Sequence, residues 1–228
     1  MTATATAKTA APAADNIKGW GRKEMAKRLA DDIPEGWYVN LGIGIPLLVG
    51  DYVPPDREVI LQSENGILGM GPLQTKRTFD PWIVNAGKQN VTLKTGASIV
   101  GHADSFAMIR GGHLDLCVLG SFEVASNGDF ANWTTSLKSV PAVGGAMDLA
   151  VGAKRIWLLM EHTSKDGKPR LLERCTMPLT APGVVKRVYT NLAVVDITAR
   201  GFELVSMTPE ITFEALQART GAKIHRKD

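Results

Sequence analysis

The sequence feature that most restricts the fold of this chain is a recurring alternation. Short apolar segments run directly into glycine-rich or polar loops. The runs at residues 114–119 (LDLCVL) and 155–160 (RIWLLM) are continuously apolar apart from Asp115 and Arg155, and they are too short for typical helices. Such runs are typical of strands buried on both faces of a parallel sheet. Amphipathic helices are predicted between the strands, for example over residues 104–110. The pattern predicts an α/β layered domain with a largely parallel open sheet.

Turn residues predict the finer boundaries in the rest of the chain. Residues 91–93 and 98–100 are predicted to be short strands on either side of a Thr95-Gly96 turn. Strands over 189–197 and 202–206 are predicted to pair, so antiparallel strands are expected in the C-terminal third. A closing helix is expected before Gly221.

Length and composition predict one folded domain. At 228 residues the chain is long enough for a sizeable core, and we expect a single domain over residues 17–228. Residues 1–16, MTATATAKTAAPAADN, are rich in Ala and Thr and are predicted to form a disordered tail without a secretory signal. The two cysteines, Cys117 and Cys175, lie in apolar strand-like runs and are expected to be reduced core thiols. We therefore expect a cytoplasmic protein.

Charge and hydropathy exclude two kinds of partner. The formal net charge is only +3, with the two signs interspersed, so no nucleic-acid partner is expected. No apolar run approaches the roughly 20 residues that a membrane-spanning helix needs, so no membrane partner is expected.

Four loops that follow predicted strands are candidates for the functional site. Ligands of open α/β sheets bind outside the carboxyl ends of the strands, where such loops converge. If the glycines serve only helix–strand packing, this convergence has no function, and the sequence alone leaves that alternative open. The loops contain Asn40 with Gly42 and Gly44, residues 63–66 (SENG), Gly120-Ser121, and Gly144-Gly145-Ala146.

Glu64 is the most conspicuous polar residue in these loops. It follows a short apolar strand, precedes Asn65-Gly66, and has no basic residue within eleven positions downstream. A carboxylate displayed at a strand end can act as a base or as a nucleophile. The spacing is equally compatible with Glu64 capping a following helix.

Two other kinds of site are disfavoured. Gly42 and Gly44 begin a dinucleotide-binding fingerprint, but its third glycine position is occupied by Leu47. The four histidines show no metal-ligand spacing, so no metal is expected. They are His102, His113, His162 and His225.

Five blocks of sequence resemble the family I CoA-transferases, in particular the B subunits of the 3-oxoacid CoA-transferases. The resemblance covers about residues 20–222, which is nearly all of the predicted folded part. The block QSENGILG at 62–69 is similar to the active-site signature of that family. The other blocks are NAGK at 85–88, DSFAMIRGGHLD at 104–115, GDFANW at 128–133 and GGAMDL at 144–149.

The resemblance implies a ping-pong reaction in which Glu64 carries first an acyl group and then CoA as a thioester. It implies that the backbone N–H groups of Gly145 and Ala146 stabilise the oxyanion of each tetrahedral step. Asn40 matches a polar side chain near the thioester, and Lys88 matches a lysine that contacts CoA. CoA and acyl-CoA are then substrates, and no cofactor is expected.

The resemblance is greatest to the 3-oxoadipate branch, which acts in aromatic degradation by the β-ketoadipate route. It implies an acyl-CoA and a 3-oxo acid as small-molecule substrates, with succinyl-CoA as donor and an A subunit as partner in an A2B2 assembly. One departure is the basic loop at 73–80 (LQTKRTFD), where that branch usually has an acidic one. This loop either favours a dicarboxylate or only faces solvent.

Three alternatives stay open at this point. The B subunit of a succinyl-CoA:acetoacetate (3-ketoacid) CoA-transferase is the nearest. A sugar-phosphate isomerase with a carboxylate base is more remote, and a non-catalytic binding partner with a decayed site is the least supported, since the SENG segment is intact.

Overall fold

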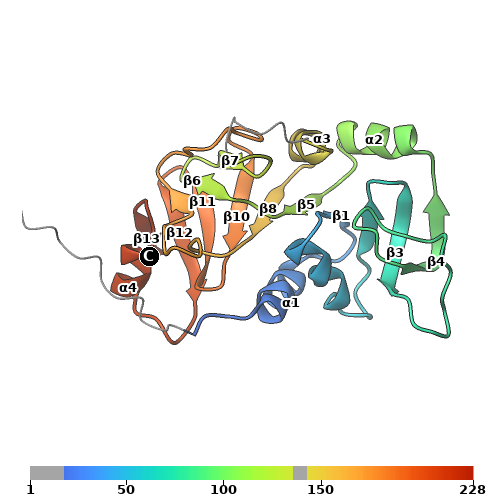
Figure 1. Ribbon diagram of the computed structural model, residues 1–228, viewed down its shortest axis with the longest axis horizontal. Coiled ribbons are helices and arrows are strands. Elements are labelled where there is room, and N and C mark those ends of the chain that lie inside the picture. The colour runs from blue at the N-terminus through green and yellow to red at the C-terminus, as the bar shows by residue number, and fades with distance from the viewer. Residues whose placement is uncertain (1–17, 136–142, 228) are drawn as a thin grey trace, which may run out of the picture.

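The computed structural model describes residues 18–135 and 143–227, so the predicted tail at 1–16 lies outside the described residues. Ten strands form one mixed sheet in the order β13-β12-β11-β10-β8-β5-β1-β2-β3-β4 (Figure 1). Its strands are β1 (Tyr38–Leu41), β2 (Ile60–Ser63), β3 (Ile67–Leu73), β4 (Val91–Ile99), β5 (Leu116–Leu119), β8 (Ile156–Leu159), β10 (Val185–Tyr189), β11 (Ala193–Thr198), β12 (Gly201–Met207) and β13 (Ile224–Arg226).

Helices and a small second sheet cover the large sheet. The helices are α1 (Arg22–Asp32), the 3-10 helix η1 (Ile45–Asp51), α2 (His102–Arg110), α3 (Ala146–Gly152) and α4 (Phe213–Ala218). The second sheet has the order β7-β6-β9, with bounds Phe130–Ala131, Glu123–Ala125 and Leu171–Leu172. Figure 1 shows α2 and α3 side by side, above the strands and opposite α1.

The predicted α/β fold with a largely parallel sheet is confirmed. The five central strands, β10, β8, β5, β1 and β2, all pair in parallel. The C-terminal strands β10, β11 and β12 pair antiparallel as expected. Because the central strands run in one direction, the loops after them emerge at one edge of the sheet.

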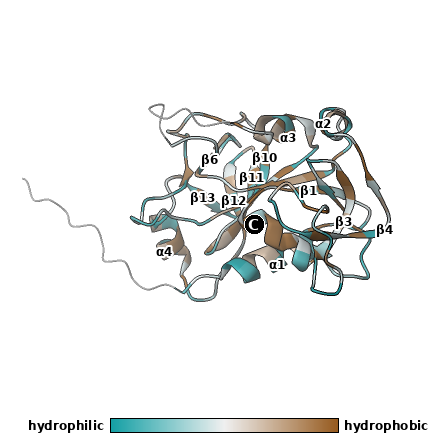
Figure 2. Ribbon diagram, turned by 45° about the vertical axis from the view of Figure 1, so that its right-hand side comes forward, coloured by the Kyte–Doolittle hydropathy of each residue, from teal (hydrophilic) through white to brown (hydrophobic). Residues whose placement is uncertain are grey.

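Hydrophobic side chains fill both faces of the central sheet, which explains the continuously apolar runs. In β5, Leu116 and Val118 pack in a cluster with α1, while Cys117 and Leu119 pack on the other face with α2 and α3. Figure 2 shows hydrophobic residues concentrated on the strands and on the inner part of α1. Burial on both faces therefore leaves only the strand ends and loops for polar chemistry.

Several predicted boundaries are wrong. Antiparallel strands are not confined to the C-terminal third, because β3 and β4 add an antiparallel pair after β2. Residues 91–99 form one strand rather than two around a turn. Gly96 has a φ of 85°, and the register with β3 shifts nearby, so the glycine is accommodated within an irregular ladder.

Three smaller predictions also need correction. The strand expected over 189–197 is divided, with Tyr189 ending β10 and β11 beginning at Ala193. A further strand, β13, follows the closing helix. Cys117 is a buried free thiol in a strand as predicted, but Cys175 is only half-buried and lies outside the strands.

Candidate active site

A tight hairpin turn displays Glu64 between β2 and β3. Gly66 N donates to Ser63 O at 2.9 Å, which closes the turn around Glu64 and Asn65. Gly66 has a φ of 119°, and a Cβ there would lie 2.2 Å from Val100 O, so this position requires glycine. A strand rather than a helix follows Glu64, so the alternative that Glu64 caps a helix is wrong.

The Glu64 carboxylate lies directly against the loop that begins α3. A Cβ on Gly145 would be 2.7 Å from Glu64 Oε2 and 3.0 Å from Cζ of Phe106. Only a residue without a side chain allows this approach. The structure therefore brings Glu64 to Gly145 and the adjacent Ala146, as the strand-end rule and the resemblance both predicted.

Burial and two neighbouring charged groups set the electrostatics of Glu64. Burial raises the pKa of the Glu64 carboxyl above its ordinary value, because desolvation disfavours the charged form. His102 acts in the opposite direction, and the negative charge of Asp148 raises the pKa further. Asp148 is itself paired with Arg110, whose Nε lies 2.8 Å from Asp148 Oδ1. A more basic, partly desolvated carboxylate is a stronger nucleophile once it is ionised.

Asn40 lies at the end of β1, lines the same cavity, and is held in a buried hydrogen-bond network. Its Nδ2 donates to Gln62 Oε1 at 2.5 Å, and Gln62 Nε2 donates to Ser105 Oγ at 2.8 Å. The Cys117 thiol donates to Asn40 Oδ1 at 3.6 Å. The sequence reasoning missed Ser105 and Cys117 as supports of Asn40, because they come from distant segments and carry no local signal.

Lys88 lies in a tight turn next to the Glu64 loop but does not line the cavity. Its φ of 62° is the one positive value for a non-glycine residue among residues 18–135 and 143–227. The turn is tied to the site because Ala86 N donates to Ser63 Oγ at 2.9 Å, and Ala86 lines the cavity. The Lys88 side chain is exposed, so its contact with CoA stays a prediction.

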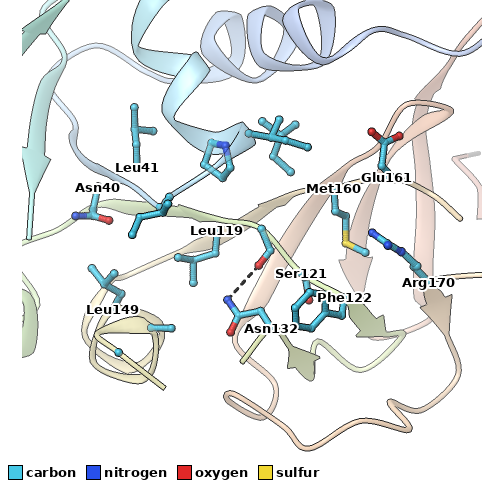
Figure 3. A pocket seen from close by; sticks show the side chains of 18 of the residues that line it. Asn40, Leu41, Leu119, Ser121, Phe122, Asn132, Leu149, Met160, Glu161 and Arg170 are labelled. Carbon is cyan, nitrogen blue, oxygen red and sulfur yellow. Dashed lines mark hydrogen bonds between the residues drawn. The ribbon is translucent and has the colours of Figure 1, made fainter. Parts of the chain in front are cut away.

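Glu64 lies in a cavity of about 860 Å³ at the carboxyl ends of four neighbouring strands, β2, β1, β5 and β8. Figure 3 shows Asn40 on one side of it and Glu161 and Arg170 on the other. The sequence reasoning missed Glu161 and Arg170, since neither belongs to a recognised block. The basic loop at 73–80 does not line this cavity, and Lys76 and Arg77 are exposed.

The described residues hold no group of three His, Cys, Asp or Glu side chains that could bind a metal ion. His162 is fully buried, and its ring nitrogens lie 2.9 Å from the hydroxyls of Thr190 and Thr220. The His102 ring packs at a tilt of 47° against the Phe106 ring, with ring centroids 4.6 Å apart. The absence of a metal from the reaction stays a prediction.

This fold and site define a coenzyme A transferase, and the chain belongs to that family. The family described as "Coenzyme A transferase" matches residues 22–219. Among curated relatives, the B subunit of the 3-oxoadipate CoA-transferase of Pseudomonas putida is 51% identical over 91% of this chain and 97% of its own length. The B subunit of a "Probable succinyl-CoA:3-ketoacid coenzyme A transferase" of Bacillus subtilis is 47% identical over 88% of this chain and 93% of its own length.

Solved structures share the fold at low sequence identity. The acyl-CoA transferase YdiF of Escherichia coli O157:H7 matches with a TM-score of 0.70 and 19% identity over 90% of this chain. This chain spans only 42% of the YdiF chain. Glutaconate coenzyme A-transferase from Acidaminococcus fermentans matches with a TM-score of 0.65 and 16% identity over 93% of this chain and 91% of its own.

In the described part of the chain, every helix is too short or too polar to span a lipid bilayer.

Proposed function

We propose that this chain is the catalytic B subunit of a 3-oxoadipate CoA-transferase, which moves CoA from succinyl-CoA to 3-oxoadipate. One observation carries the proposal: the Glu64 carboxylate lies against Gly145, the residue just before α3, and the chain belongs to the coenzyme A transferase family. The substrates are taken from the curated relatives of Pseudomonas putida and Acinetobacter baylyi, which are 51% and 48% identical to this chain.

The proposed reaction uses Glu64 as a covalent carrier. Its carboxylate oxygen attacks the thioester carbonyl, the C–S bond breaks, and CoA leaves as a thiolate, so that an acyl–glutamyl anhydride forms. The thiolate then attacks the glutamyl carbonyl and expels succinate, which leaves a glutamyl-CoA thioester. The carboxylate of 3-oxoadipate reverses these two steps and departs as 3-oxoadipyl-CoA. The acyl group and CoA thus remain in an anhydride or a thioester throughout, and neither bond is lost to hydrolysis.

The neighbours of Glu64 supply the electrostatic support that this chemistry needs. Each attack creates an oxyanion, which preorganised N–H donors stabilise strongly. Gly145 and Ala146 begin α3 beside the carboxylate, so their backbone N–H groups are assigned this role. Asn40 is assigned to the thioester and Lys88 to CoA, following the resemblance. The proposed steps call for no cofactor or metal, because the thioester is itself the activated group.

The proposed partner is an A subunit of the same transferase, in an A2B2 assembly. Several curated relatives are themselves named as B subunits. The segment between β3 and β4 carries exposed apolar side chains, including Trp82, which is 87% exposed, and Phe79, which is 62% exposed. Large contiguous patches of exposed apolar side chains mark protein–protein contacts. We place the assembly in the cytoplasm, with no nucleic-acid or membrane partner.

A second candidate is a succinyl-CoA:3-ketoacid transferase that uses acetoacetate. The Bacillus subtilis relative and one from Helicobacter pylori, at 47% and 44% identity, favour it. The chain assembled with its A subunit should be assayed with succinyl-CoA against both acids. A higher kcat/KM for 3-oxoadipate supports the first assignment, and a higher value for acetoacetate replaces it with the second.

The covalent step is tested by mass spectrometry of the intact protein mixed with succinyl-CoA. We expect an adduct of the mass of CoA on Glu64, its removal by borohydride, and loss of both adduct and turnover in Glu64→Ala. Glu58→Gln, an exposed carboxylate just before β2, is the matched control and should behave as wild type. Full turnover by Glu64→Ala refutes the nucleophile. Isomerisation of a sugar phosphate without any adduct would instead support the isomerase alternative.

A further inference from the structure

Three side chains that can form hydrogen bonds lie in one row across the central sheet. Asn40 of β1 pairs with Gln62 of β2 on one side and with Cys117 of β5 on the other. Because these positions are paired, their side chains lie on one face of the sheet, the face that α2 and α3 cover. The next positions in the row, Leu68 of β3 and Ile156 of β8, are apolar. Polar groups therefore interrupt an otherwise apolar row.

Of the three side chains in this row, only Asn40 reaches the cavity that holds Glu64. Asn40 and Gln62 are each 2% exposed, and Cys117 is fully buried. Asn40 lines the cavity, whereas Gln62 and Cys117 do not. Burying an amide is unfavourable unless its hydrogen bonds are made, so packing alone would favour an apolar residue at position 62. The amide of Gln62 is therefore explained by its neighbour rather than by the core.

The hydrogen bonds of Gln62 fix the orientation of the Asn40 amide. The main-chain oxygen of Gln62 lies 3.3 Å from Asn40 Nδ2, and because a carbonyl oxygen only accepts, the nitrogen of Asn40 must face β2. Gln62 Oε1 then accepts from the same nitrogen at 2.5 Å, which leaves Gln62 Nε2 to donate to Ser105 Oγ at 2.8 Å. The Asn40 oxygen therefore faces β5, where the Cys117 thiol donates to it at 3.6 Å. Figure 3 shows this oxygen on the side of Leu119 and the nitrogen on the opposite side.

Ser105 anchors the Gln62 amide to α2. It is 1% exposed, and its backbone N donates to Gly101 O at 3.0 Å within the first turn of the helix, so the place of its hydroxyl is fixed. Asn40 has no such restraint of its own, because the terminal torsion of an asparagine is broad and the two ends of its amide are similar in size. Without Gln62 the Asn40 amide is therefore free to turn over.

We infer that Gln62, anchored by Ser105, is a positioning residue that holds the Asn40 amide in one orientation during CoA transfer. This inference rests on the proposed function, which assigns Asn40 to the thioester. Gln62 does not line the cavity, so it acts through Asn40 and not on the substrate. A misplaced group at the reacting atoms slows the chemical step, so the effect should fall on kcat rather than on KM.

The first test is Gln62→Met in the chain assembled with its A subunit, because methionine is unbranched like glutamine and its sulfur is only a weak acceptor. We expect kcat for transfer from succinyl-CoA to fall by about 10- to 100-fold, with KM nearly unchanged. Ser105→Ala removes only the anchor and should give a smaller loss of the same kind. Gln217→Met is the matched control and should behave as wild type, since Gln217 also bonds main-chain atoms but lies outside the cavity lining. Thermal melting shows whether each variant is folded.

A double variant separates positioning from a merely structural role. If Gln62 acts through Asn40, the enzyme with both Gln62→Met and Asn40→Ala should be no slower than Asn40→Ala alone. Losses that multiply would show that Gln62 acts independently of Asn40 and would overturn the inference. A wild-type kcat in Gln62→Met would overturn it as well.

The S–H stretching band of Cys117 reports the same contact without turnover. The infrared difference spectrum between wild type and Cys117→Ala isolates this band, whose frequency rises when the thiol loses its acceptor. We expect this rise in Gln62→Met, because the Asn40 oxygen no longer stays beside the thiol, and no change in Gln217→Met. If the wild-type assembly transfers no CoA, the proposed function fails, and a shifted band still supports the positioning of Asn40 by Gln62. An unshifted band refutes the inference whether or not transfer occurs.

Discussion

The contact between Gly145 and Glu64 predicts a large kinetic effect from adding a single methyl group. In Gly145→Ala, the new Cβ would lie 2.7 Å from Glu64 Oε2 and 3.0 Å from Cζ of Phe106. Restoring the ordinary contact distance of 3.4 Å moves the carboxylate or the start of α3 by about 0.7 Å. A misplacement of about 1 Å at reacting groups can cost about 100-fold in rate. We therefore expect formation of the glutamyl adduct to slow by 10- to 100-fold.

This effect should be kinetic rather than a loss of stability. The backbone of Gly145 has a φ of −80° and a ψ of 0°, which alanine adopts without strain. The assay is single-turnover adduct formation from succinyl-CoA, followed by quenching and intact-mass analysis, with thermal melting alongside. Gly120→Ala is the matched control, because Gly120 lines the same cavity and its Cβ would meet no atom within 4 Å. A Gly145→Ala enzyme with the wild-type rate would refute the packing argument, as would an equal slowing by Gly120→Ala.

Three further predictions concern stability and reactivity. Burial lowers the pKa of His162 to about 4, against an ordinary value of 6.5, so the unfolded chain binds its proton first as the pH falls. The free energy of unfolding should therefore decrease from about pH 6.5 to pH 4, by up to about 3 kcal/mol, and denaturant titrations of His162→Gln should show a flatter pH dependence. Gly66→Ala should cost more than about 2 kcal/mol in urea unfolding, because its Cβ would overlap Val100 O and its φ is positive; a change below about 0.5 kcal/mol would contradict this. Burial raises the pKa of the Cys117 thiol well above its usual range, so iodoacetamide at pH 8 should alkylate Cys117 only after unfolding, and rapid labelling of the native protein would count against its burial.

Local sequence was sufficient to predict four of the five central strands, but β10 was missed except for its last residue, Tyr189. The runs around Cys117 and Trp157 are apolar at every position because both faces of β5 and β8 are covered, and this signal does not depend on distant residues. The edge strands carried a weaker signal. The strand β4 is mostly exposed, and Gly96 interrupts it with a positive φ, so its sequence resembles two strands and a turn.

The candidate site was predicted in part. Glu64, Asn40, Gly145 and Ala146 could be grouped because each lies at the end of a strand or in a loop at the carboxyl edge of a parallel sheet, and all four do line one cavity. Arg170 could not be found in this way, because it follows a hairpin and lies in no block of the resemblance.

The sequence by itself determined the α/β class, the family, and the loop that carries Glu64, because strand periodicity and a short contiguous motif are local properties of the chain. Only the tertiary structure decided that β3 returns antiparallel after Glu64 and that the backbone of Gly145 packs against the carboxylate. It also decided that Arg170 shares the cavity of Glu64 across three strands. These contacts join segments far apart in the chain, so they depend on the order of strands in the sheet and on side-chain packing, which no local pattern encodes.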